Sequence, residues 1–238
     1  TGIPEIDYII SDKYAYKDEQ KEFFVEKFWN MPQVLQCLSK DNLDLIYQET
    51  PAIKNQFVTF GSFNNTAKLN DRVIQIWSKI LKNVENSKIF LKNYLLGDEE
   101  IKRALINKFK HNGINENRIV IQKETKSRKK SLEMYNEVDI ALDTFPYNGV
   151  TTTFEALWKG VPVLVLKGYN FNSRCGESIL KNAKLEFFLS SNEEEYIKKA
   201  IYLSNNIEKL EKERKKIYNE ILSTPLFNSK KFSSNLKD

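Results

Sequence analysis

The chain has 238 residues, enough for one large domain or two small ones, and its 41% hydrophobic and 29% charged residues are ordinary for a globular protein. It contains no apolar run of roughly 18 or more residues, which argues against a membrane-spanning helix, and its formal charge of +5 does not require a nucleic-acid partner. Two cysteines, Cys37 and Cys175, and a single histidine, His111, are too few for a disulfide framework or a metal cluster, so we expect neither a metal nor a cofactor.

The first 55 residues lack the pattern of a complete domain. They mix short apolar pieces with polar turns and end in QETPAIKNQ, where Pro51 and the absence of periodicity indicate a linker. The chain begins at Thr1 in the middle of such a piece, which suggests a segment of a longer protein, and it opens without a basic and apolar leader. We therefore expect a cytoplasmic protein whose main domain occupies residues 56–238.

From Phe57 onward, short apolar runs alternate with amphipathic segments. Residues 56–65 predict a buried strand followed by a polar turn. Residues 71–84 predict a helix because five apolar side chains fall on one face at helical spacing: Val73, Ile76, Trp77, Ile80 and Leu81. The pattern continues with a strand at 87–93, a helix at 98–113 that ends at Gly113, and a strand at 118–122.

The second half of the chain repeats this rhythm. The pattern predicts helices at 131–138, 151–160 and 173–183, strands at 139–143, 161–168 and 186–190, and two closing helices at 192–206 and 207–222. Strands separated by helices of about 10 to 15 residues are typical of βαβ units with right-handed crossovers. We therefore predict an α/β fold with a Rossmann-like, doubly wound parallel sheet.

The segment DIALDTFPYNGVTTTFEALWKGVPVLVLKG, residues 139–168, contains the main candidate for a binding site. In a doubly wound sheet, ligands bind beyond the carboxyl ends of the strands, where turns lead into helices. Gly149 lets a ligand approach the backbone, and the amides and hydroxyls of Thr151 and Thr152 would bind a phosphate. One turn later, Glu155 would accept hydrogen bonds from sugar hydroxyls. The alternative is that the polar residues before this helix are ordinary caps, and the segment has neither G-x-G-x-x-G nor a P-loop.

Two other loops also follow strands and so open on the same side of the sheet. The turn FGSFNNTAK, residues 60–68, would bring Lys68 to a diphosphate from across the cleft. The basic run KETKSRKK, residues 123–130, would bring Arg128 toward the ligand. The alternative for both side chains is a solvated position on the surface, which is where most lysines and arginines lie.

The block LDTFPYNG-x-TTT-x-EALW-x-GVPV, together with TFGSFNNTAKLNDRVIQIWSKILKNV, VEKFWNMP and STPLFNSKKFSSNL, resembles the catalytic region of the O-GlcNAc transferase and SPINDLY family. The resemblance extends over nearly the whole chain. It implies the C-terminal, nucleotide-sugar-binding lobe of a two-lobed GT-B glycosyltransferase, here residues 56–238. Residues 1–55 would then be the tail of the N-terminal catalytic lobe plus a linker, with the rest of that lobe and tetratricopeptide repeats upstream.

The resemblance also assigns roles by position. It implies that Lys68 is the catalytic residue that contacts the leaving diphosphate. The residues that it implies for donor binding are Asn65, Arg128, Gly149, Val150, Thr151, Thr152 and Glu155, with the threonines at the pyrophosphate and the glutamate at the ribose. Val150 replaces a more polar residue of several relatives, and Ser131 stands where many relatives have a histidine that packs on the base. The second departure leaves the identity of the base open.

The activity that the resemblance implies is an inverting, metal-independent transfer of GlcNAc from UDP-GlcNAc to serine or threonine hydroxyls of acceptor proteins. Without the first lobe, we expect the chain to bind the donor but not to turn it over. One alternative is a GDP-fucose-dependent protein O-fucosyltransferase. Another is a non-catalytic module whose basic loop, residues 123–130, binds an acidic partner or, less in keeping with the modest charge, a nucleic acid.

Overall fold

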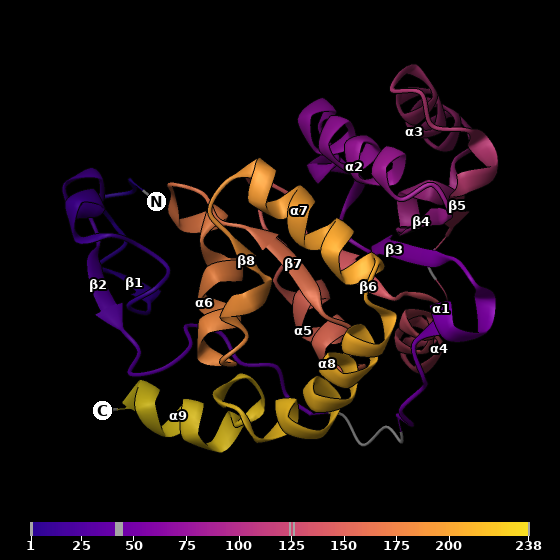
Figure 1. Cartoon of the computed structure of the whole chain (residues 1–238). Coiled ribbons are helices and arrows are strands. Elements are labelled where there is room, and N and C mark those ends of the chain that lie inside the picture. Colours follow the sequence, from indigo (N-terminus) through magenta and orange to yellow (C-terminus); the bar gives the residue numbers. More distant parts are fainter. Residues whose placement is uncertain (1, 41–44, 124, 126, 238) are drawn as a thin grey trace.

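The computed structural model describes residues 2–40, 45–123, 125 and 127–237. Its centre is a six-stranded parallel sheet with the spatial order β5-β4-β3-β6-β7-β8 (Figure 1). Counted along the chain from β3, this order is 3-2-1-4-5-6, the order of the Rossmann fold, which confirms the predicted fold class. The strands are β3 (Val58–Ser62), β4 (Ser87–Lys92), β5 (Ile119–Gln122), β6 (Ile140–Leu142), β7 (Val163–Leu166) and β8 (Leu189–Ser190).

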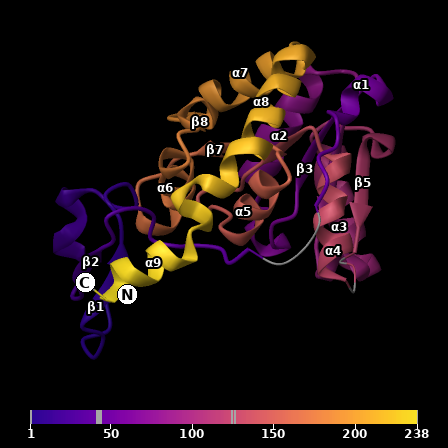
Figure 2. The same ribbon diagram turned by 90° about the horizontal axis from the view of Figure 1, so that it is seen from below.

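Helices lie on both faces of this sheet. On one side α2 packs against α7, and on the other α5 packs against α6 (Figures 1 and 2). The helices that connect or follow the strands are α2 (Asp71–Asn83), α3 (Glu99–His111), α4 (Arg128–Glu133), α5 (Thr151–Trp158), α6 (Cys175–Asn182), α7 (Glu193–Ser204) and α8 (Ile207–Glu220). No helix within these described ranges is long and apolar enough to cross a membrane.

Helix α2 shows how the sequence pattern becomes a packed element. The Asn70 side chain caps its start by accepting a hydrogen bond from the Val73 amide at 3.0 Å, and all five apolar residues of the predicted face are buried. Trp77 is fully buried, and its indole nitrogen donates to the Tyr196 hydroxyl of α7 at 3.3 Å. The Tyr196 hydroxyl in turn donates to the Asp143 carbonyl at 3.2 Å, so the helix pair supports the end of β6.

Several expected elements differ from the structure. The predicted linker around Pro51 contains the short helix α1 (Pro51–Asn55). The helix expected at 131–138 begins at Arg128 and continues as a 3-10 turn after Glu133, and most of the strand expected at 186–190 is a 3-10 turn. A third closing helix, α9 (Ser229–Lys237), was not predicted. Helix α9 begins just after Phe227, which packs against Phe154 and Trp158 of α5. This tertiary contact fixes the start of the helix.

The amino-terminal segment forms a small parallel sheet of its own, β1 (Tyr8–Ser11) with β2 (Lys27–Asn30), beside α6 (Figure 1). The buried carboxylate of Asp12 joins the two parts. It accepts hydrogen bonds from the amides of Tyr14 at 2.8 Å and Leu35 at 2.9 Å, and from the Ser178 hydroxyl of α6.

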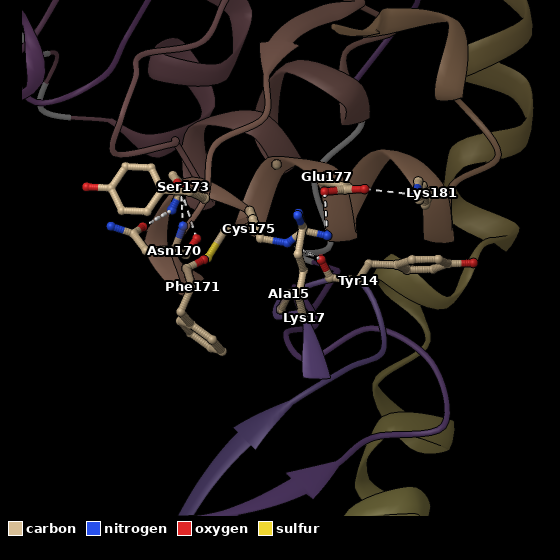
Figure 3. A network of polar contacts seen from close by, with 12 residues as sticks. Tyr14, Ala15, Lys17, Asn170, Phe171, Ser173, Cys175, Glu177 and Lys181 are labelled. Atoms are coloured by element: carbon tan, nitrogen blue, oxygen red, sulfur yellow. Dashed lines mark hydrogen bonds and ion pairs between the residues drawn. The ribbon is translucent and has the colours of Figure 1, made fainter. Parts of the chain in front are cut away.

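A second set of contacts strengthens this junction. Arg174 donates to the Tyr14 carbonyl at 3.0 Å and pairs with the buried Glu177 at 2.9 Å. Lys181 pairs with the same glutamate at 2.8 Å (Figure 3). Its ammonium group lies 4.9 Å from the centre of the Tyr14 ring. Residues 2–40 are therefore attached to the large domain mainly through α6.

Candidate functional site

The candidate site lies at the carboxyl ends of β3 and β6, the two central strands of the sheet. The chain leaves β3 toward β4 on one side and leaves β6 toward β7 on the other, so this is the switch point where open α/β sheets bind ligands. Two segments meet there, residues 63–70 after β3 and residues 143–150 after β6. The sequence analysis assigned candidate residues to both.

Asp143 organises the switch point. Its side chain is buried, and its Oδ1 accepts hydrogen bonds from the Gly149 amide at 2.6 Å, the Thr144 amide at 2.9 Å and the Asn64 side chain at 3.3 Å. Its other oxygen, Oδ2, has no hydrogen-bond partner among the described residues. Burial raises the pKa of Asp143 to about 7, although the two amides favour the charged form. The carboxyl group thus ties the end of β3 to the turn that precedes α5.

Two further contacts fix the first turn of α5. The Thr152 hydroxyl donates to Asn64 Oδ1 at 3.0 Å, and the buried Tyr135 hydroxyl donates to the Thr152 carbonyl at 3.0 Å. A Cβ atom on Gly149 would lie 2.6 Å from the Thr152 hydroxyl and 2.7 Å from Asn64 Oδ1, so no side chain fits at this position. The glycine is required by close packing.

The start of α5 is available to a ligand. The N-cap residue is Val150, and no side chain caps the helix, so the capping alternative does not describe this turn. Thr151 is exposed and Thr152 is half-buried. Asn148 is buried, and its side-chain oxygen accepts a hydrogen bond from the Gly176 amide of α6 at 3.2 Å. Uncapped amides at a helix start favour an anion.

Lys68 approaches this turn from the β3 side. Its ammonium donates to the Asn148 carbonyl at 2.8 Å and lies 3.9 Å from the centre of the Tyr147 ring. Partial burial lowers the pKa of Lys68, and the charge of Asp143 opposes this shift. Asn65 is exposed, and its side chain caps the turn that carries Lys68 by accepting from the Ala67 amide at 2.9 Å. Both residues line a hollow of about 490 Å³.

Four other candidate residues line a second hollow of about 410 Å³, here named the Arg128 hollow. Its lining residues are Phe63, Lys92, Asn93, Tyr94, Thr125, Arg128, Ser131, Thr151, Thr152 and Glu155. Arg128 pairs with Glu155 at 2.9 Å, with the glutamate side chain only 14% exposed. The turn 148–150, which contains Gly149 and Val150, connects the residues that line the two hollows.

The structure brings the predicted site residues together around the switch point, and the sequence analysis missed the residues that support that turn. Asp143, Asn64 and Tyr135 were not singled out, although Asp143 directly follows a strand inside the quoted motif. Lys92, at the end of β4, was also missed. Of the basic run 123–130, residues 124 and 126 lie outside the described residues. Within the residues that the structure describes, no group of three or more His, Cys, Asp and Glu side chains is placed to hold a metal ion.

Comparison with known proteins identifies the family. Residues 40–236 match the model of glycosyl transferase family 41. The chain belongs to this family. It is 32% identical over 237 residues to proteins from Petunia hybrida and Arabidopsis thaliana, each named "Probable UDP-N-acetylglucosamine--peptide N-acetylglucosaminyltransferase SPINDLY". The match covers all of this family 41 chain but only 25% and 26% of those relatives, so the chain spans about a quarter of their length.

One solved structure agrees with this family 41 assignment, and a second shares the fold. A mutant of the O-GlcNAc transferase of Thermobaculum terrenum is 26% identical, with a TM-score of 0.88 over 99% of this chain and 44% of that one. WaaG, a glycosyltransferase involved in lipopolysaccharide biosynthesis, is 13% identical, with a TM-score of 0.56 over 92% of this chain and 59% of that one. The second likeness concerns the fold alone, which is the GT-B arrangement of glycosyltransferases. The resemblance stated from the sequence is therefore confirmed.

Proposed function

We propose that this chain forms the nucleotide-sugar-binding lobe of a protein O-glycosyltransferase, and that the start of α5 holds the diphosphate of the donor. The observation that carries the proposal is the convergence of Lys68 and the uncapped first turn of α5 at the switch point. The helix amides and the Thr151 hydroxyl bind phosphate oxygens, and the Thr152 hydroxyl turns from Asn64 Oδ1 to do the same. Lys68 then moves from the Asn148 carbonyl to the phosphate that leaves.

The reaction explains why these groups are needed. When the bond between the sugar and the diphosphate breaks, negative charge grows on the phosphate oxygens. Donors held in place by the protein stabilise that charge more in the transition state than in the ground state. The Asp143 carboxyl group holds the Gly149 amide and the Tyr135 hydroxyl holds the Thr152 carbonyl, so the amides of the turn need little reorganisation.

The remaining candidate residues suit the nucleoside half of the donor. Glu155 lies one turn along α5 from the phosphate end and accepts hydrogen bonds from ribose hydroxyls. Its ion pair with Arg128 orients the carboxylate toward the Arg128 hollow. The names of the SPINDLY relatives, which give UDP-N-acetylglucosamine as donor and a peptide as acceptor, support UDP-GlcNAc as the donor here. We take a serine or threonine hydroxyl of a protein as the acceptor and GDP-fucose as the alternative donor.

The small sheet supports the division of the chain into two lobes. Parallel sheets are normally covered on both faces, yet in the described chain Tyr8 is 53% exposed, Ile10 40% and Trp29 38%. Residues 1–55 would belong to the first lobe and its linker, residues 56–238 to the donor-binding lobe. The remainder of the first lobe would cover the exposed apolar side chains and supply the acceptor site.

Calorimetric titration of this chain with UDP and GDP tests the proposal. We expect UDP to bind more tightly than GDP, and Lys68→Ala and Thr152→Val each to weaken UDP binding by about 10-fold, because each loses a hydrogen-bond donor to an anion. Lys79→Ala, an exposed lysine of α2, is the control and should bind as the wild type does. Failure of the folded chain to bind either nucleotide would contradict the proposal and favour the non-catalytic module.

A further inference from the structure

A buried lysine lies in the wall of the Arg128 hollow. Lys92 is the last residue of β4 and is only 5% exposed. Its ammonium donates to the Ser131 hydroxyl and to the Ser131 carbonyl at 3.4 Å, and it lies 4.7 Å from the centre of the Phe63 ring. Burying an ammonium group is costly, and a lysine side chain at the end of a strand usually extends into water. Lys92 therefore places a charged hydrogen-bond donor in the wall of the hollow.

The surroundings of Lys92 suit a flat, polar ring. Phe63 is held by two aromatic neighbours, Tyr135 at 4.3 Å and Phe90 at 5.3 Å between ring centres, so its ring is a fixed surface. Ser131 adds a hydroxyl that both donates and accepts. Thr151 and Glu155 line the same hollow. If phosphate binds at the start of α5, the nucleoside extends into this hollow.

We propose that Lys92 selects the base of the nucleotide by donating a hydrogen bond to a ring carbonyl, so that the site accepts the oxo bases uracil and guanine and rejects the amino bases cytosine and adenine. The proposal rests on the proposed function of the site and deepens it. An ammonium group has three donors and no acceptor. Uracil O4 and guanine O6 accept such a bond, whereas the amino groups of cytosine and adenine at the equivalent positions are donors themselves. Two donors facing each other in a buried site repel.

The test compares UDP, CDP, GDP and ADP by calorimetry on the wild-type chain and on Lys92→Met, which keeps an unbranched side chain of nearly the same length and removes its donors. The wild type should bind UDP at least about 10-fold more tightly than CDP, and GDP more tightly than ADP, because a charged donor is matched only by the oxo base. Lys92→Met should weaken UDP binding about 10-fold and leave CDP binding nearly unchanged, so that the two affinities converge. Lys129→Met, an exposed lysine of α4, should keep the wild-type preference.

Two results would overturn the proposal while leaving the proposed function intact. One is equal loss of UDP and CDP binding in Lys92→Met, which would make the lysine a purely structural part of the wall. The other is a wild-type chain that binds CDP as tightly as UDP, and this result does not depend on whether the variant folds. UMP lacks the second phosphate of UDP and therefore tests the base end of the site alone. Lys92→Met should still weaken UMP binding, whereas Lys68→Ala should weaken the binding of UMP much less than that of UDP. Absence of binding by any of the four nucleotides would instead refute the proposed function.

Discussion

At the scale of single residues, the buried carboxyl group of Asp143 predicts a pH dependence of stability. Its ordinary pKa of 3.8 rises to about 7 in the folded chain because burial disfavours the charged form. Between these two pH values the folded state holds a proton that the unfolded state has lost. The free energy of unfolding contributed by this group therefore falls as pH rises from about 4 to about 7 and is constant above that.

Asp143→Asn removes this titration while keeping an oxygen that accepts from the Gly149 and Thr144 amides. Measured by urea unfolding at a series of pH values, the stability of the variant relative to the wild type should rise from pH 4 to pH 7 and then level off. Burial also raises the pKa of Asp139, to about 6. Because Asp139 is present in both proteins, its titration does not change the difference between their free energies of unfolding. Parallel stability curves over this range would contradict the predicted protonation of Asp143.

At the scale of elements, the turn before α5 depends on the absence of a side chain at Gly149. A Cβ atom there would meet Asp143 Oδ1 at 2.9 Å as well as the Thr152 and Asn64 oxygens. Gly149→Ala should therefore move the turn, lower the free energy of unfolding by about 1 to 3 kcal/mol and abolish measurable UDP binding. Thermal unfolding and calorimetry measure the two effects.

Gly97→Ala is a matched control for this element. A Cβ atom at Gly97 would meet only the Lys123 side chain, at 3.6 and 3.8 Å, which is ordinary contact. This variant should unfold and bind UDP as the wild type does. Normal UDP affinity in Gly149→Ala would show that the packing of the turn does not set the geometry of the site.

At the scale of the whole molecule, Asp12 connects the amino-terminal segment to the donor-binding domain. Asp12→Ala would leave the Tyr14, Ala15 and Leu35 amides and the Ser178 hydroxyl without their buried acceptor. The small sheet should then detach from α6 more often. We expect faster proteolytic cleavage before residue 40, measured by limited proteolysis, with residues 56–238 still protected.

Asp18→Ala serves as the control for this experiment. Asp18 forms an exposed pair with Lys21 in the same segment, so its removal should leave the cleavage rate unchanged. Equal cleavage rates in the two variants would mean that the contacts of Asp12 do not hold the segment against α6. The predicted cytoplasmic location and the upstream repeats remain predictions at this scale.

Local sequence patterns were enough to predict most elements of the main domain and the family of the chain. Periodicity identified α2 and the alternating strands, and the motif that contains Thr151, Thr152 and Glu155 gave the family. These signals are local, because a helix face, a glycine turn or a motif is encoded within about 10 to 30 neighbouring residues.

The residues that support the site come from distant parts of the sequence, and only their packing in the folded chain reveals them. The bond between Asn64 and Asp143 joins residues 79 positions apart, and the contact of Lys92 with Ser131 joins residues 39 apart. The contact of Phe227 with Phe154 and the bond of Asp12 with Ser178 of α6 also join residues that lie far apart in the sequence. Such pairs depend on the order of the strands and on burial, and local periodicity encodes neither.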